Sequence, residues 1–222
     1  MPRKYIVRVG LSIVVIIAIT IAVRLLLSSG HDLFAAVGRN DADKVRECID
    51  TGQDPNARGE FGWTPLHCAA RSGFEECAKA LINGGANVRL VDDQGNTPLH
   101  IAAGENKEPV VRLLLKSGAD PKAVNTNGDT PLHLAAAHSG RGSAEALLQG
   151  GALVDCKNAE GKTPLFEAVA LGDRRIVQML VDHGASLTEK DRKGESLVDV
   201  ISPGNRSMVE LLERLATQPS RR

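Results

Sequence analysis

Beyond residue 30, short groups of apolar residues recur at helical spacing, and the groups themselves repeat every 33 residues. In one such unit, Leu66, Ala69 and Ala70 lie three and four residues apart, so they share one face of a short helix. Cys77 and Leu81 repeat that spacing and predict a second helix. The stretch up to the next unit is polar and contains glycine, which predicts an extended loop with a turn at its tip. Each unit is therefore expected to form a pair of helices followed by a loop.

A tetrapeptide marks the start of each unit. Thr-Pro-Leu-His begins at Thr64, Thr97 and Thr130, and a fourth copy at Thr163 ends in Phe166 instead of histidine. The threonine suits a helix N-cap, and the proline suits the first helical position, where no amide donor is needed. The glycines that close the second helix and those at the loop tips keep the same interval: Gly52, Gly85, Gly118, Gly151 and Gly184, and then Gly62, Gly95, Gly128, Gly161 and Gly194. A period held without gaps indicates tandem structural units.

The tetrapeptide, the alanine pair after it, the leucine-rich second helix at 110–115 and the Gly-Ala-Asp run at 118–120 together resemble the ankyrin repeat family. The resemblance covers residues 31–217. It implies an all-α fold, the ankyrin-repeat α-solenoid, in which helix-turn-helix units form an L-shaped stack and hairpin loops project to one side. Stacked repeats present extended surfaces that bind other proteins. The resemblance therefore implies a protein partner and a non-enzymatic scaffold or adaptor.

Continuing the register outward gives the ends of the array. One interval before Thr64 falls at His31, where the helix pattern lacks its Thr-Pro start, and one interval after Thr163 falls at Ser196. Atypical ends are expected because a terminal repeat has one solvated side. The predicted organisation is a basic tail at 1–5, a transmembrane helix or signal anchor at 6–27, a linker at 28–30, an ankyrin repeat domain at 31–217 with repeats 31–63, 64–96, 97–129, 130–162 and 163–195 and a cap at 196–217, and a tail at 218–222.

The segment at 6–27 is almost wholly apolar, and Arg8 and Arg24 lie near its two ends. As a helix it would span about 33 Å, close to the roughly 30 Å hydrocarbon core of a bilayer. We therefore expect an uncleaved single-pass anchor. The uninterrupted stretch at 9–23 also suits the core of a cleaved signal peptide, although no small-x-small cleavage site follows closely. A helix buried within a soluble domain is the third interpretation.

Charges around this segment favour one orientation. Arg3, Lys4 and Arg8 precede or open it, which favours a cytoplasmic amino terminus with the repeat domain outside, in the periplasm if the protein is bacterial. Three more basic residues follow within 39–46, so the bias is modest and the reverse orientation stays open.

Composition and spacing argue against nucleic-acid and metal binding. The chain has 27 basic and 27 acidic residues, but four basic residues and no acid fall within the first 30, so the repeats are mildly acidic, whereas a nucleic-acid interface needs basic residues. His67, His100 and His133 are one repeat apart, roughly 10 Å along a stack of helices. That is too far to share a metal ion at bonds of about 2 Å. The resemblance implies instead that these histidines make structural hydrogen bonds between loops.

Catalytic motifs are also missing from the sequence. Gly161-Lys162-Thr163 resembles the end of a phosphate-binding loop, but the glycine required five residues earlier is Cys156. The four cysteines include no Cys-x-x-Cys pair and do not indicate a compartment. We expect no enzyme, no cofactor, no metal and no small-molecule substrate.

The informative residues are those that the repeat does not explain. Phe61 and Trp63, the single tryptophan, are aromatic residues among charged ones at the first loop tip, and such residues are typical interface anchors. The alternative is that Trp63 only packs on the neighbouring loop. The predicted partner-binding residues are Arg58, Glu60, Phe61, Trp63, Asp93 and Gln94.

We therefore expect a membrane-anchored ankyrin-repeat interaction module. The alternative is an exported soluble ankyrin protein that stabilises or inhibits a partner enzyme. A cleaved N-terminal segment would favour this alternative.

Overall fold

The computed structural model describes residues 31–217. The predicted basic tail, transmembrane helix at 6–27, linker and C-terminal tail lie outside the described residues. Between residues 31 and 217 the chain forms helices and loops without a strand, which agrees with the predicted all-α class. None of the helices in this range is long and apolar enough to cross a membrane.

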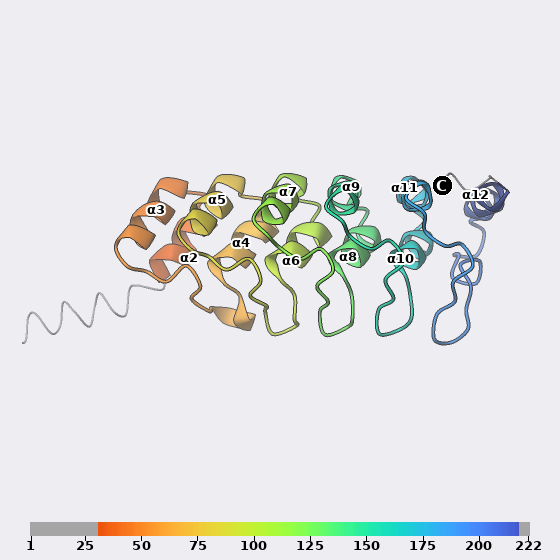
Figure 1. The fold of residues 1–222 in the computed structure, drawn as a ribbon, viewed down its shortest axis with the longest axis horizontal. Coiled ribbons are helices and arrows are strands. Elements are labelled where there is room, and N and C mark those ends of the chain that lie inside the picture. Colours follow the sequence, from red (N-terminus) through yellow and green to blue (C-terminus); the bar gives the residue numbers. More distant parts are fainter. Residues whose placement is uncertain (1–30, 218–222) are drawn as a thin grey trace, which may run out of the picture.

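The helices stack in two rows, and the loops project to one side (Figure 1). Within a row each helix packs on the next, and it also packs on its partner in the other row. The first row holds α2 (His31–Gly38), α4 (Pro65–Ser72), α6 (Pro98–Gly104), α8 (Pro131–Ala137) and α10 (Pro164–Leu171). The second row holds α3 (Ala42–Asp50), α5 (Glu75–Asn83), α7 (Glu108–Lys116), α9 (Arg141–Gln149) and α11 (Arg174–Asp182), and α12 (Arg206–Ala216) follows at the end.

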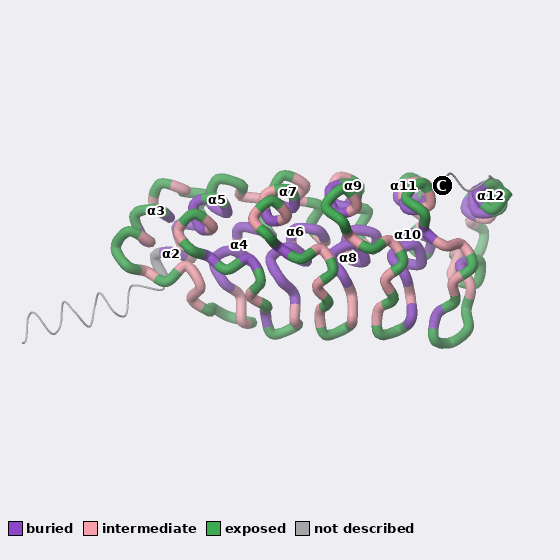
Figure 2. The backbone as a smooth tube through the Cα atoms, viewed as in Figure 1, coloured by how far each residue is buried: buried purple, intermediate pink, exposed green. Residues whose placement is uncertain are grey.

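The core is a continuous apolar layer between the two rows (Figure 2). Each Thr-Pro-Leu unit contributes one fully buried leucine, and the small alanines beside it let neighbouring helices pack closely. Helix α12 closes the stack, since its buried face packs towards α11. The residues of that face are Met208, Leu211, Leu212 and Leu215.

A histidine joins each repeat to the next. The backbone N–H of Thr97 donates to Nδ1 of His100 over 3.2 Å, and Nε2 of the same ring lies 3.0 Å from the carbonyl oxygen of Asp129. A carbonyl only accepts and an amide only donates, so the proton is on Nε2 and the ring is neutral. Burial accordingly lowers the pKa of His100. His67 and His133 make the same bonds, to Asn96 and Lys162, which confirms their predicted structural role.

The fourth tetrapeptide lacks this bond. Phe166 occupies the histidine position, and the hydroxyl of Thr163 is left fully buried without a hydrogen-bond partner among the described residues. In the third copy the Thr130 hydroxyl lies 2.8 Å from Nδ1 of His133. The two threonines thus occupy the same place in the repeat, but only the Thr130 hydroxyl is hydrogen-bonded.

The loop tips are joined as well. Ala159 donates its backbone N–H to the carbonyl of Asn127 over 2.9 Å, and equivalent bonds join the other successive tips. Gly128 lies at this junction with a φ of +75°, and a Cβ there would stand 2.7 Å from the Ala159 nitrogen. Gly194, on the last tip, has a φ of +83° but nothing within 4 Å of such an atom. Close stacking of the tips therefore requires glycine at position 128. At Gly194 only the left-handed backbone conformation favours glycine.

We predict that Thr130→Val lowers the free energy of unfolding by about 1–2 kcal/mol, because it removes a buried hydrogen bond. Thr163→Val should leave the free energy of unfolding unchanged or raise it by about 1 kcal/mol, since it removes a buried hydroxyl that has no partner. Urea unfolding followed by circular dichroism measures both. Equal losses in the two variants would mean that the Thr163 hydroxyl is hydrogen-bonded.

A second matched pair tests the loop stacking. Gly194→Ala should cost roughly 1–2 kcal/mol of unfolding free energy, from the left-handed backbone alone. Gly128→Ala should cost roughly 3 kcal/mol, because overpacking against the next loop adds to the same strain. Thermal and urea unfolding of both variants give the comparison. A cost for Gly194→Ala that matches Gly128→Ala would show that contact between tips is not the reason for glycine.

Candidate protein-binding site

The backbone turn at the tip of the first loop differs from those of the later loops. In later repeats an Asp or Asn begins the tip and accepts two backbone N–H bonds, as Asn125 does from Asn127 and Asp129 at 3.0 Å each. Gly59 stands at this position in the first loop. Its N–H donates to the Trp63 carbonyl over 2.7 Å, as the equivalent residue does in the later repeats, but glycine has no side chain to accept the two other bonds. The chain between them forms the short 3₁₀ helix η1 (Glu60–Gly62).

Phe34 explains this departure. By the repeat interval it stands where the other units have His67, His100 or His133, so the Trp63 carbonyl receives no bond from an imidazole. The Phe34 ring lies against Gly59 instead, where a Cβ would stand 3.1 Å from its Cζ atom. A phenyl group in place of the histidine and a glycine in place of the aspartate or asparagine thus reshape the first loop together.

The reshaped turn exposes Phe61. This residue has a φ of +57°, in the left-handed region that residues other than glycine rarely adopt, and its side chain is 76% exposed. Strained backbone of this kind costs of order 1–3 kcal/mol and concentrates at functional sites. A large apolar side chain held in solvent by an unfavourable backbone conformation is a candidate contact for another protein.

Trp63 is half-buried behind Phe61. Its ring lies 6.3 Å from the His67 ring, at an interplanar angle of 31°. The guanidinium carbon of Arg71 lies 5.5 Å from the Trp63 ring centroid, which is a cation–π distance. The ring therefore packs on its own repeat and still presents part of its surface to solvent, so the two sequence-based interpretations of Trp63 are compatible.

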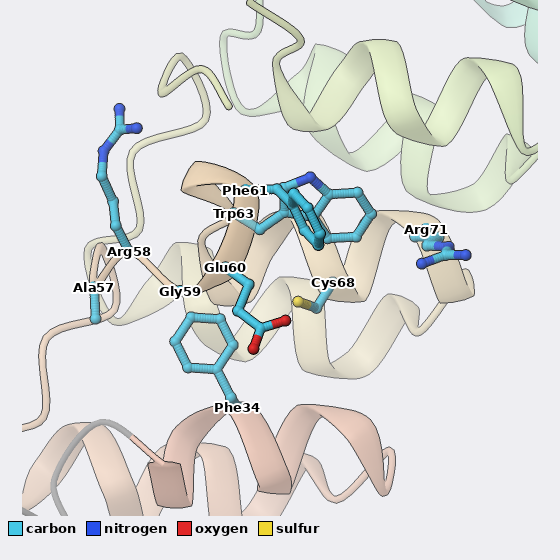
Figure 3. A pocket seen from close by; sticks show the side chains of 9 residues that line it. All are labelled: Phe34, Ala57, Arg58, Gly59, Glu60, Phe61, Trp63, Cys68 and Arg71. Carbon is cyan, nitrogen blue, oxygen red and sulfur yellow. The ribbon is translucent and has the colours of Figure 1, made fainter. Parts of the chain in front are cut away.

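Between these side chains lies a cavity of about 560 Å³. Figure 3 shows Phe34, Phe61 and Trp63 around it, with the Glu60 carboxylate near Cys68 and the Arg58 guanidinium pointing away from the other side chains. The cavity is lined by Phe34, Ala57, Arg58, Gly59, Glu60, Phe61, Trp63, Cys68 and Arg71. Aromatic walls with a few polar groups are typical of a recognition pocket.

Four of the six predicted binding residues line this cavity: Arg58, Glu60, Phe61 and Trp63. Asp93 and Gln94 do not line it. They are exposed on the next loop tip, where the Asp93 N–H donates to the Phe61 carbonyl over 3.1 Å and the Gln94 carbonyl accepts from Thr126. Asp93 therefore joins its own tip to the first one, and Gln94 joins it to the following one.

Five lining residues were not predicted: Phe34, Ala57, Gly59, Cys68 and Arg71. The repeat register offered a signal for two of them, since Phe34 replaces the histidine and Arg71 occupies a position that holds glycine or alanine in the next three repeats. Cys68 of α4 is half-buried, and this burial raises the pKa of its thiol.

Metal and catalytic chemistry find no support in residues 31–217. No group of three or more His, Cys, Asp or Glu side chains within that range could hold a metal ion. The three bridging histidines are neutral and use both ring nitrogens within the fold.

A comparison with protein families agrees with the repeat geometry. The family described as ankyrin repeats (3 copies) matches residues 33–125 and 117–191, which is most of the chain. The chain belongs to the ankyrin repeat family. Ankyrin repeats act as protein–protein interaction modules and are generally non-catalytic, so the first loop of this ankyrin array is a candidate binding surface for protein.

Curated relatives share only short segments with this ankyrin protein. Potassium channel KOR1 of Oryza sativa subsp. japonica is 43% identical over 65 residues, 29% of this chain and 8% of that protein. Ankyrin repeat-containing protein P1E11.10 of Schizosaccharomyces pombe is 31% identical over 61 residues, 28% of this chain and 30% of that protein. Protein phosphatase 1 regulatory subunit 12A of Mus musculus is 32% identical over 65 residues, 29% of this chain and 6% of that protein. The matches cover about two repeats, far less than each relative's length.

Proposed function

We propose that this protein is a membrane-anchored ankyrin-repeat module that binds a partner protein through its first loops. The observation that carries the proposal is the cavity beside Phe61 and Trp63, since the Phe61 side chain is 76% exposed and is not buried in the stack of repeats. In this proposal the two aromatic rings are the apolar anchors. The residues around them are Arg58, Glu60, Asp93 and Gln94.

The anchor is the second part of the proposal. Residues 6–27 would hold the repeats close to the membrane through the short linker at 28–30, with the amino terminus in the cytoplasm and the array outside. The support is the apolar length of this segment and the basic residues Arg3, Lys4 and Arg8 at its start. An anchor confines a binding surface to two dimensions and raises its local concentration relative to a membrane partner.

Truncation of the two aromatic side chains tests the binding site. Trp63→Ala should weaken partner binding by about 2 kcal/mol or more, as expected for an aromatic anchor. Phe61→Ala should weaken binding by about 1–2 kcal/mol with no loss of folding stability, because the side chain is 76% exposed. Capture of the partner from solubilised membranes by each full-length variant is measured beside thermal unfolding.

The matched control is Val124→Ala, which truncates a 60% exposed apolar residue on a later loop. It should leave capture unchanged. If Trp63→Ala unfolds readily but captures the partner as well as the wild-type protein does, Trp63 is a packing residue and the site lies elsewhere, with Lys190–Lys193 on the last full loop as the next place to examine.

Protease treatment of spheroplasts, or of intact cells, tests the topology. The repeats should be digested without breaking the membrane that bears the anchor. In the undigested protein, mass spectrometry should find residues 1–27 still attached to the repeats. Digestion only after that membrane is opened would reverse the orientation. A mature chain that begins after residue 27 would favour the alternative function, an exported soluble protein that stabilises or inhibits a partner enzyme.

A further inference from the structure

The cavity at the first loop continues along the stack. A second hollow of about 310 Å³ shares Trp63 and Arg71 with it and reaches Ile101 and Leu134. A third hollow of about 430 Å³ shares Leu134 and reaches Lys162 and Glu167. Because each hollow shares wall residues with the next, the three form one furrow beside the first row of helices, from α4 to α10.

The two ends of this furrow differ in chemistry. At the first loop the walls are the rings of Phe34, Phe61 and Trp63. The middle is lined by the aliphatic side chains of Ile101 and Leu134 together with the polar ones of Arg71, Glu105 and His138. The aromatic end and the aliphatic part of the middle match hydrophobic side chains of an occupant.

The far end is acidic. Asp129, Glu160 and Glu167 line it against a single cation, Lys162, whose Nζ is already paired with the Glu160 carboxylate at 2.7 Å. Glu167 is half-buried and forms no ion pair with another described residue. Burial raises the pKa of its carboxyl. The Lys162 ammonium group acts on Glu167 only from a distance, because it is paired with Glu160. A partly desolvated carboxylate without a direct ion pair is complementary to an incoming basic group.

The furrow also sets a length. Three repeat steps separate the aromatic end from the acidic end, and helices stack about 8–10 Å apart, so the ends lie roughly 24–30 Å from each other. An extended chain advances about 3.3 Å per residue, so it covers this distance in about eight residues.

We propose that the furrow binds an extended segment of the partner protein that carries a large apolar side chain and, about eight residues away, a lysine or arginine. The apolar side chain enters the cavity between Phe34 and Trp63, and aliphatic residues between the two ends lie over Ile101 and Leu134. The basic side chain extends to Asp129 and Glu167, where its long stem stays on the apolar wall and its charge meets the carboxylates. This inference rests on the proposed function and names the chemistry of its partner.

Selection from a phage-displayed library of random twelve-residue peptides tests the proposal against the full-length protein in mild detergent. The wild-type protein should enrich peptides with an aromatic residue or leucine about eight positions from a lysine or arginine. Glu167→Lys should select acidic residues in place of the lysine or arginine and should keep the preference for the apolar residue. Trp63→Ala should lose the apolar preference and keep the basic one.

Synthetic copies of the enriched peptides then give affinities by fluorescence anisotropy. Glu167→Lys should weaken the wild-type peptides by at least about tenfold, the scale of one interfacial charge pair. The matched control is Glu75→Lys, the same charge change at an exposed residue of α5 outside the furrow. It should change the affinity less than about twofold, in line with distant surface charges.

Enrichment without a basic residue at the predicted spacing, or a preference that Glu167→Lys does not alter, would overturn the inference. So would the absence of any enriched peptide. Partner capture that fails in Trp63→Ala but persists in Glu167→Lys would keep the proposed function and reject the furrow as its binding site.

Discussion

The stack depends on one small group, the neutral imidazole that joins each repeat to the next. Its Nδ1 holds the start of its own helix, and its Nε2 donates to the carbonyl 29 residues further along the chain. Both bonds need the uncharged ring, so burial and hydrogen bonding favour the same protonation state. The bond fixes where the following helix begins, and this places the next loop against the previous one. Regular loop tips with glycine at the junctions follow from that placement.

The candidate site arises where this connection is missing. Phe34 replaces the imidazole in the first unit, and the first loop makes its own turn through Gly59. The Trp63 carbonyl keeps its turn bond to Gly59 but has no imidazole partner, and the Phe34 ring lies against Gly59. The same substitution that removes a structural bond therefore supplies an aromatic wall, so binding capacity is concentrated where the repeat pattern is least regular.

The sequence was sufficient for the fold because its signals are local and repeated. Thr-Pro starts, alanine faces and tip glycines each dictate a short piece of backbone, and the interval places the pieces in register. The site was predicted only in part. Exposed charges and aromatics at 58–63 were evident, but the contribution of Phe34 and Cys68 depends on how the first loop folds over α2 and α4. Asp93 and Gln94 were predicted to surround the aromatic residues, but they do not line the cavity.

Phe166 has a different consequence, because it removes the same bond near the opposite end. The free energy of a repeat array is close to a sum of terms between neighbours. The junction after α10 lacks one favourable term, as the junction after α2 does, and the terminal helix α12 packs mainly on α11. Under partial denaturation, the last unit and α12 would separate readily, while the bridged units stay assembled. The array therefore has one end that separates before the bridged repeats unfold, and that end lies farthest from the aromatic cavity.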